Sequence, residues 1–221
     1  MADMPAYTKK LRATLSPAVA EVLKKLNTPH KIQDYLDTLS INFDPTGDLL
    51  STKRVIEQQT AQCIEGALFA AASLAYHGEV PLLLDVQTIA EDEDHVVALF
   101  KQHGLWGAIS KTNHGILRWR DPIYKTVREV AMSYFHEYYM HDGRKSMRAY
   151  SKPFDLRRYE PSFWVMSGES LEDIAYDLDV SPHFPAFPKF AKHTLRPVSK
   201  IEIQLLDHVE WQRPKNNVQN N

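Results

Sequence analysis

Cys63 is the only cysteine in the sequence, and His95 follows it after a stretch that predicts a helix and then strands. A thiol becomes a nucleophile when its pKa is lowered, which the N-terminus of a helix and a nearby imidazolium both do. Thr60 can serve as the N-cap, which puts Cys63 in the first turn; if Ser51 caps one continuous helix instead, Cys63 lies mid-helix. A thiol followed by an imidazole, each on a rigid element, is typical of a nucleophile and its general base.

A general-base imidazole needs a partner on its other ring nitrogen to orient it. The segment Lys101–Gly104 predicts a hairpin, and its possible loop lengths place His95 opposite residue 110, 111 or 112. The partner is therefore expected in the window 110–113, which contains no carboxylate. We assign Asn113, the best hydrogen-bond acceptor in that window, and regard Ser110 as the weaker candidate.

An oxyanion formed by attack of the thiol needs hydrogen-bond donors beside Cys63. Gln58, Gln59 and Gln62 lie just before it, and a side-chain amide there could act together with the Cys63 backbone N–H. We assign Gln59 to this role. Glu65, in the same expected turn, works against ionisation of the thiol.

The elements around these residues predict an α+β fold. Residues 62–76 are apolar on nearly every side, which is typical of a helix inside the protein rather than on its surface. We expect this cysteine-bearing helix to pack on an antiparallel sheet, with additional helices toward the C-terminus. Helices are expected at 17–26, 32–39, from Asp121-Pro122 through Tyr138, and at 171–178; strands at 81–86, 95–100, 105–109 and 201–209; and a proline-rich loop at 183–188.

Length and composition predict one domain in a reducing compartment. Of 221 residues, 43% are hydrophobic and 24% charged, which is ordinary for a globular protein. We expect a flexible N-terminal arm (1–15), a single domain (16–212) and a disordered tail (213–221). No signal peptide or membrane span is expected, so the predicted location is cytoplasmic. A single cysteine excludes an intramolecular disulfide and any multi-thiolate metal site.

Three stretches of the sequence together resemble the transglutaminase-like superfamily of cysteine enzymes. They are Gln62–Leu68, Asp94–Ala98 and Leu105–Ile109, the last carrying Trp106. The resemblance covers about residues 55–115, where the chain is especially similar to small bacterial transglutaminase-like domains and papain-type peptidases. It implies a cysteine at the start of a buried helix, a histidine on a following strand, and an aspartate after the tryptophan. The position of that aspartate is occupied by Ser110.

This resemblance implies thiol-dependent acyl transfer on a peptide, protein or small amide substrate, as an amidase, peptidase or transamidase. Cys63 and His95 are the residues that match in order and context. Because the aspartate is missing, the alternative is a catalytically inactive fold of the same kind that acts as a binding or scaffold domain.

Two further interpretations of this region are not favoured. Asp85, Asp92, Asp94, His95 and His114 offer metal ligands, but their spacing is not diagnostic, and we predict neither a metal nor another cofactor.

Arg118 and Arg120 flank Trp119 and could contact RNA. Arginines in such a loop more commonly pair with carboxylates, and the net charge of −2 gives no basic field. We therefore predict neither a nucleic-acid nor a membrane partner.

Overall fold

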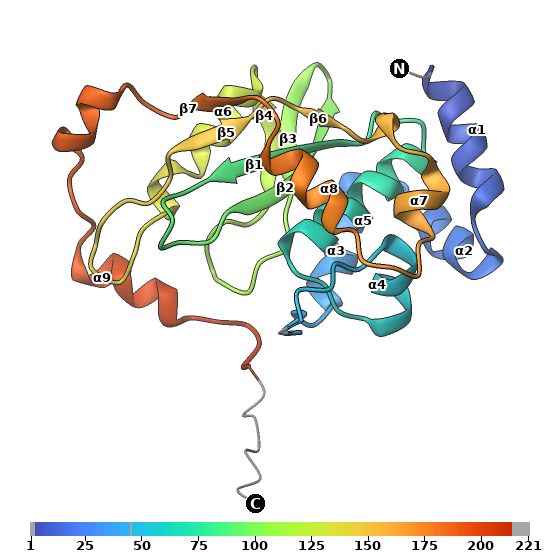
Figure 1. Ribbon diagram of the computed structural model, residues 1–221, viewed down its shortest axis with the longest axis horizontal. Helices are drawn as coiled ribbons and strands as arrows, with labels where there is room; N and C mark the ends of the chain where they lie inside the picture. The colour runs from blue at the N-terminus through green and yellow to red at the C-terminus, as the bar shows by residue number, and fades with distance from the viewer. Residues whose placement is uncertain (1–2, 45, 214–221) are drawn as a thin grey trace, which may run out of the picture.

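The computed structural model describes residues 3–44 and 46–213 (Figure 1). The helices of this part of the chain are α1 (Met4–Thr14), α2 (Pro17–Lys25), α3 (Pro29–Thr38), α4 (Thr52–Gln58), α5 (Cys63–Tyr76), α6 (Val127–Ser133), α7 (Pro161–Val165), α8 (Glu172–Asp179) and α9 (Lys200–Ile203). The strands are β1 (Leu82–Gln87), β2 (His95–Gln102), β3 (Leu105–Ile109), β4 (Arg120–Tyr124), β5 (Ala149–Ser151), β6 (Phe154–Asp155) and β7 (His183–Pro185).

Within the described residues, seven strands form one antiparallel sheet in the order β4-β3-β2-β1-β5-β7, with β6 also paired to β1. The turn between β2 and β3 consists of His103 and Gly104, which both have positive φ, 50° and 83°. Two such residues are typical of a tight hairpin turn whose twist matches the strands. This turn sets the register from Gln102 opposite Leu105 to Ala98 opposite Ile109, where the pairing ends.

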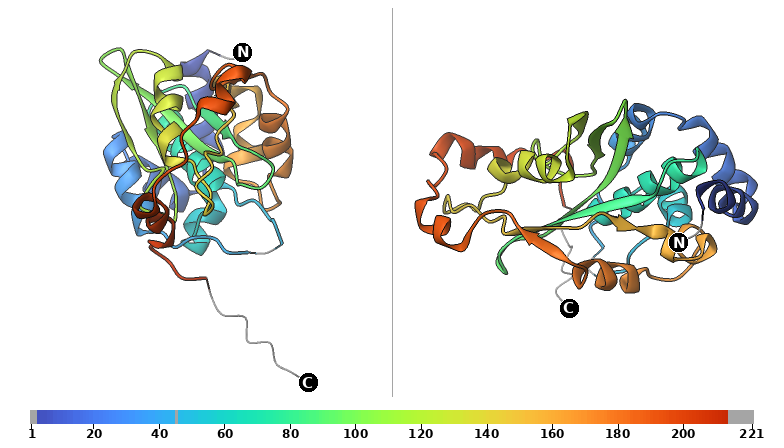
Figure 2. Two further views of the ribbon diagram at one scale, coloured as in Figure 1. Left: turned by 90° about the vertical axis from the view of Figure 1, so that its left-hand side faces the viewer. Right: turned by 90° about the horizontal axis from the view of Figure 1, so that it is seen from above.

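The two faces of the sheet pack against different helices. Val96 and Ala98 of β2 join the core that also contains α1–α5, α7 and α8, whereas Val97 and Leu99 join the core beneath α6. This alternation follows from the period of two in a strand. Figure 2 shows α6 on one side of the strands and α8 on the other. The predicted α+β class, with helices packed on an antiparallel sheet, is confirmed.

Helix α5 is the centre of the larger core, as its apolar sequence predicts: residues 64–75 are all buried. Near its start it passes so close to the end of β3 that a Cβ on Gly66 would lie 2.5 Å from Lys111 Cβ. Lys111 is itself buried, and its ammonium group donates to the carbonyls of Leu36 and Leu39 at the end of α3. A cation at a helix C-terminus satisfies carbonyls that have no partner within the helix. These contacts hold the N-terminal end of α5 against the sheet.

The prediction of a flexible arm over residues 1–15 is wrong for the described part of that segment. Residues 4–14 form α1, and Tyr7 and Leu11, four positions apart on one face, are buried. The Trp164 indole N–H donates to the Tyr7 hydroxyl over 3.0 Å, and Thr8 donates to the Ala75 carbonyl. Apolar burial against α5 and α7 outweighs the basic composition of the segment.

Two other predicted elements are also different. Asp121 and Pro122 do not begin a helix but lie in β4, an edge strand where the missing N–H of proline is tolerated; α6 begins later, with Thr126 as its N-cap. Residues 201–209, predicted as a strand, contain most of α9 and a short 3₁₀ turn, Gln204–Asp207.

The proline-rich loop expected at 183–188 begins with strand β7, which pairs with β5. In the predicted tail, residues 214–221 lie outside the described residues. No helix among the described residues combines the length and the apolar character that crossing a membrane requires.

Candidate functional site

Cys63 is the first residue of α5, as predicted, although its N-cap is Gln62 and not Thr60. Ser51 caps the separate helix α4, which ends at Gln59 in a left-handed conformation with φ 54°. The Gln62 N–H donates to Glu65 Oε2 over 2.6 Å. The Cys63 N–H is therefore among the first four amides of the helix, which have no partner within it.

The Cys63 sulfur lies beside the first residues of β2. The backbone groups of Val96, the residue directly after His95, and of Ile64 lie close enough to lower the pKa of the thiol. The N-terminus of α5 thus brings the thiol beside the first peptides of β2, while the His95 ring packs toward the end of α6, with its centroid 6.3 Å from that of Tyr134.

His95 is oriented by a short chain of hydrogen bonds. Its Nε2 lies 2.8 Å from Ser110 Oγ, and that hydroxyl donates to the Leu117 carbonyl over 2.5 Å. Because the serine proton is used on Leu117, Ser110 Oγ accepts from the ring, so we assign the imidazole proton to Nε2. Burial lowers the pKa of His95, and the Leu117 backbone raises it. Ser110 and Leu117 together therefore orient the ring.

Leu117, whose carbonyl accepts the last of these hydrogen bonds, has φ 60°, an unfavourable conformation for a residue with a bulky side chain. Its N–H donates to Glu137 Oε2 over 2.6 Å, and Glu137 Oε1 lies 2.6 Å from the Arg120 guanidinium. Strain at a residue that is held by its surroundings in this way is concentrated at functional sites. The backbone around Leu117 positions the carbonyl that fixes Ser110.

The assignment of Asn113 as the partner of His95 is wrong. Its side-chain amide accepts from the Trp211 N–H over 2.8 Å and donates to the Trp211 carbonyl over 2.9 Å. If the register were extended beyond its last pair, Ala98 and Ile109, residue 112 would stand opposite His95; the pairing ends before this point, and Ser110 reaches the ring instead. Ser110 stands where the resemblance expects the aspartate.

Gln59 also lies apart from the thiol's groove. Its amide donates to the Tyr35 hydroxyl and the Ile56 carbonyl, over 3.0 and 2.7 Å, because the end of α4 directs it toward α3. Gln62 is the glutamine that lines the groove with Cys63. The geometry therefore favours Gln62 over Gln59 as a second donor to an oxyanion.

Both reactive groups are neutral at pH 7. The pKa of the Cys63 thiol is raised to about 11, mainly by burial and less by the carboxylates of Asp85 and Glu93, while the backbone groups of Val96 and Ile64 lower it. Burial lowers the pKa of His95 to about 4. The resting pair is a thiol and an imidazole, not a thiolate and an imidazolium.

The thiol opens onto an acidic groove of about 660 Å³. The groove is lined by Gln62 and Cys63 and by residues 87–90 and 92–94, which run from the end of β1 toward β2 and include three carboxylates, at 92, 93 and 94. Asp94 Oδ1 accepts from the backbone N–H and the hydroxyl of Thr88. The three carboxylates give the lining of the groove its negative charge.

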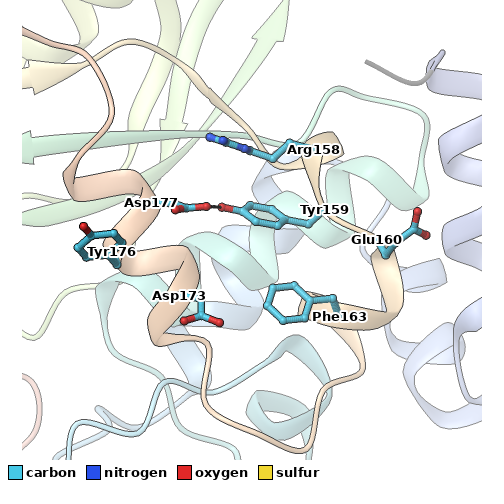
Figure 3. Close-up of a pocket in the computed structure, with 7 residues that line it drawn as sticks. All are labelled: Arg158, Tyr159, Glu160, Phe163, Asp173, Tyr176 and Asp177. Carbon is cyan, nitrogen blue, oxygen red and sulfur yellow. Dashed lines mark hydrogen bonds between the residues drawn. The ribbon is translucent and has the colours of Figure 1, made fainter.

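A second hollow of about 600 Å³ lies between α7 and α8. Figure 3 shows Tyr159 pointing toward Asp177, with Phe163 and Asp173 below them. It contains neither a thiol nor an imidazole, so its residues offer packing and charge but no nucleophile.

Comparison with known proteins gives no relative: no family model matches the sequence, and no curated protein matches it.

The two arginines considered above for RNA contact acidic side chains instead. Arg118 pairs with Glu210 and Asp37. Arg120 pairs with Glu137, and its guanidinium lies 4.0 Å from the centre of the Tyr134 ring.

The burial of neutral His95 predicts a loss of stability in acid. The unfolded chain binds a proton on this histidine near pH 6.5, and the folded chain only near pH 4, so the unfolded state binds more protons in between. Stability should fall as pH drops through this window, by about 3 kcal/mol from pH 7 to pH 4. Urea unfolding of the wild type and of His95→Gln measures this loss. If both proteins lose the same amount, His95 is not the cause.

Proposed function

We propose that this protein is a thiol-dependent acyl transferase of transglutaminase-like, papain-type fold. Cys63 is the nucleophile, His95 the general base, and Ser110 a positioning residue. The observation that carries the proposal is the hydrogen-bond chain from His95 Nε2 through Ser110 to the Leu117 carbonyl. It supports Nδ1 as the base, because Nε2 is used on Ser110.

The reaction begins from the neutral pair. Cys63 Sγ attacks the carbonyl carbon of an amide or ester, and the thiol proton passes to His95 Nδ1 as the carbon–sulfur bond forms. The intermediate collapses, the amine or alcohol leaves, and His95 returns the proton to it. Water or an amine then attacks the thioester, and His95 takes and returns a proton again.

The oxyanion of the tetrahedral intermediate needs donors beside the sulfur. The Cys63 N–H, which has no acceptor within α5, is the first, and the Gln62 side-chain amide is the second. The positive end of the α5 dipole adds to this stabilisation. Together these groups act on charge that develops only during the reaction.

The acidic wall of the groove selects substrates with a positive charge. The carboxylates of Asp92, Glu93 and Asp94 face the space that leads to Cys63, and opposite charge there favours a lysine- or arginine-containing acyl group or an amine acceptor.

Release of p-nitrophenol from two aryl esters tests the proposal, with the N-acetyl-lysine and N-acetyl-glutamate p-nitrophenyl esters as probes. The wild type should cleave the lysine ester faster, and Cys63→Ala should release no more than buffer alone. Glu93→Gln is the matched variant for the charge preference and should narrow the difference between the esters. If Cys63→Ala cleaves both esters as fast as the wild type, the proposal is wrong.

A second candidate is a binding domain of the same fold without chemistry. It is favoured by the thiol pKa of about 11 and by the neutral serine where a carboxylate would stabilise an imidazolium. In this case the wild type and Cys63→Ala bind the lysine ester equally, and neither forms a covalent adduct. The adduct therefore separates the two candidates.

A further inference from the structure

We propose that Asp85, Asp94 and Asp179 form a divalent-cation site, with Ca²⁺ as its ion, that joins the end of α8 to β1 and the start of β2. One carboxylate oxygen from each residue lies within 4.8 Å of the others. Oxygens about 2.4 Å from a single Ca²⁺ can have this separation. Asp94 also lines the groove of Cys63, but the cation site does not depend on the chemistry of Cys63.

Asp85 provides the observation that points to a ligand. The residue is only 3% exposed, and its Oδ1 is buried without a hydrogen-bond partner in the described chain. Its other oxygen, Oδ2, lies 3.0 Å from His183 Nε2, which fixes the carboxylate. A buried carboxylate oxygen without a partner is costly, and a bound cation would satisfy it.

The other two carboxylates share this arrangement, in which one oxygen is held and one is free. Asp94 Oδ1 accepts from the Thr88 N–H and hydroxyl, and Asp179 Oδ1 accepts from the Gln87 amide over 3.1 Å. Neither residue forms an ion pair within the described residues. Hydrogen bonds of this kind orient the carboxylates that bind metals. Three negative groups that would otherwise repel one another are thus held together.

The position of Asp179 is set by the anchoring of α8. Ile174 and Leu178 are buried, and the Tyr159 hydroxyl donates to Asp177, as Figure 3 shows. Asp179 is the last residue of this helix, where the backbone carbonyls carry partial negative charge and favour a cation.

The choice of Ca²⁺ follows from the ligand atoms and from the separate, partly exposed segments that carry them. Carboxylate oxygens are hard ligands that suit Ca²⁺, Mg²⁺ and Mn²⁺. Asp94 and Asp179 are exposed and come from separate segments, so they do not impose a strict octahedron. Ca²⁺ tolerates such variable geometry and fills its remaining positions with water, whereas Mg²⁺ requires a nearly ideal octahedron.

Calorimetric titration of the full chain with CaCl₂, at constant ionic strength, tests the site. The wild type should show one saturable site, and Asp94→Asn and Asp179→Asn should each weaken binding by roughly tenfold or more. Glu93→Gln removes the same charge from the same acidic segment outside the triad, and should change the affinity by less than about twofold. Asp85→Asn is a poorer probe because it also disturbs the buried partner of His183.

Three results would overturn the assignment. The first is no saturable binding by the wild type up to about 10 mM Ca²⁺, which exceeds the range of the weakest protein sites. The second is equal weakening by Glu93→Gln and Asp94→Asn, which would indicate diffuse attraction to the acidic surface. The third is tighter binding of MgCl₂ than of CaCl₂.

Discussion

Replacement of His95 by glutamine should slow acylation of Cys63 by about 10²- to 10⁴-fold at pH 7, the usual contribution of a positioned general base. Because the thiol pKa is about 11, very little thiolate exists at this pH, and attack requires a base that removes the proton. Glutamine can still donate a hydrogen bond to Ser110 Oγ but cannot accept the proton in this way. Release of p-nitrophenol from the lysine ester measures the effect.

His114→Gln is the matched control for this variant. His114 lies within the segment from Ser110 to Leu117, but its Nδ1 is 3.2 Å from the Leu206 carbonyl, and it does not line the groove of Cys63. The acylation rate of His114→Gln should stay within about twofold of the wild-type rate, because His114 takes no part in proton transfer. Equal losses in both variants would assign the effect to packing instead of to base catalysis.

The second large effect is low reactivity of Cys63 toward iodoacetamide in the absence of substrate. With a pKa of about 11, against about 8.5 for a free cysteine, the thiolate population at pH 7 is roughly 300-fold smaller. A thiolate of higher pKa is intrinsically more nucleophilic by about tenfold, so alkylation should be roughly 30-fold slower than that of N-acetylcysteine. The alkylation rate should rise about tenfold with each pH unit up to about pH 10.

The protein unfolded in urea is the control for alkylation. Since Cys63 is the only cysteine, one alkylation reaction is observed in both states. In the unfolded chain, the alkylation rate plotted against pH should have its midpoint at the pKa of a free thiol. A midpoint below about 8.5 in the folded protein would contradict a neutral resting pair and indicate a thiolate–imidazolium pair.

The core of the fold could be predicted from local sequence patterns. The apolar run at 62–76 and the strand pair around His103 and Gly104 are signals that lie within a few residues of the elements they form. Elements that depend on distant partners were not predicted. Strand β7 pairs with β5 more than thirty residues away, and α1 is helical because Tyr7 and Leu11 are buried against α5 and α7.

The candidate site follows the same division. The first-turn position of Cys63 was predictable because helix-start signals are local. The partner of His95 depends on the register of the hairpin and on where the strand pairing ends, and both are set by the tertiary structure. The sequence alone therefore did not identify Ser110, which forms the bond in place of Asn113. Burial of the thiol, which sets its pKa, comes from the tertiary structure and has no local signal.

The central claim is that Cys63 forms a thioester with the help of His95. Tandem mass spectrometry after rapid quenching of the wild type with the N-acetyl-lysine p-nitrophenyl ester tests it most directly. The claim predicts one acyl group, located on Cys63, that forms slowly in His95→Gln and disappears on addition of a free amine. Unmodified Cys63 during ester cleavage, or acylation at the same rate in both proteins, would contradict it.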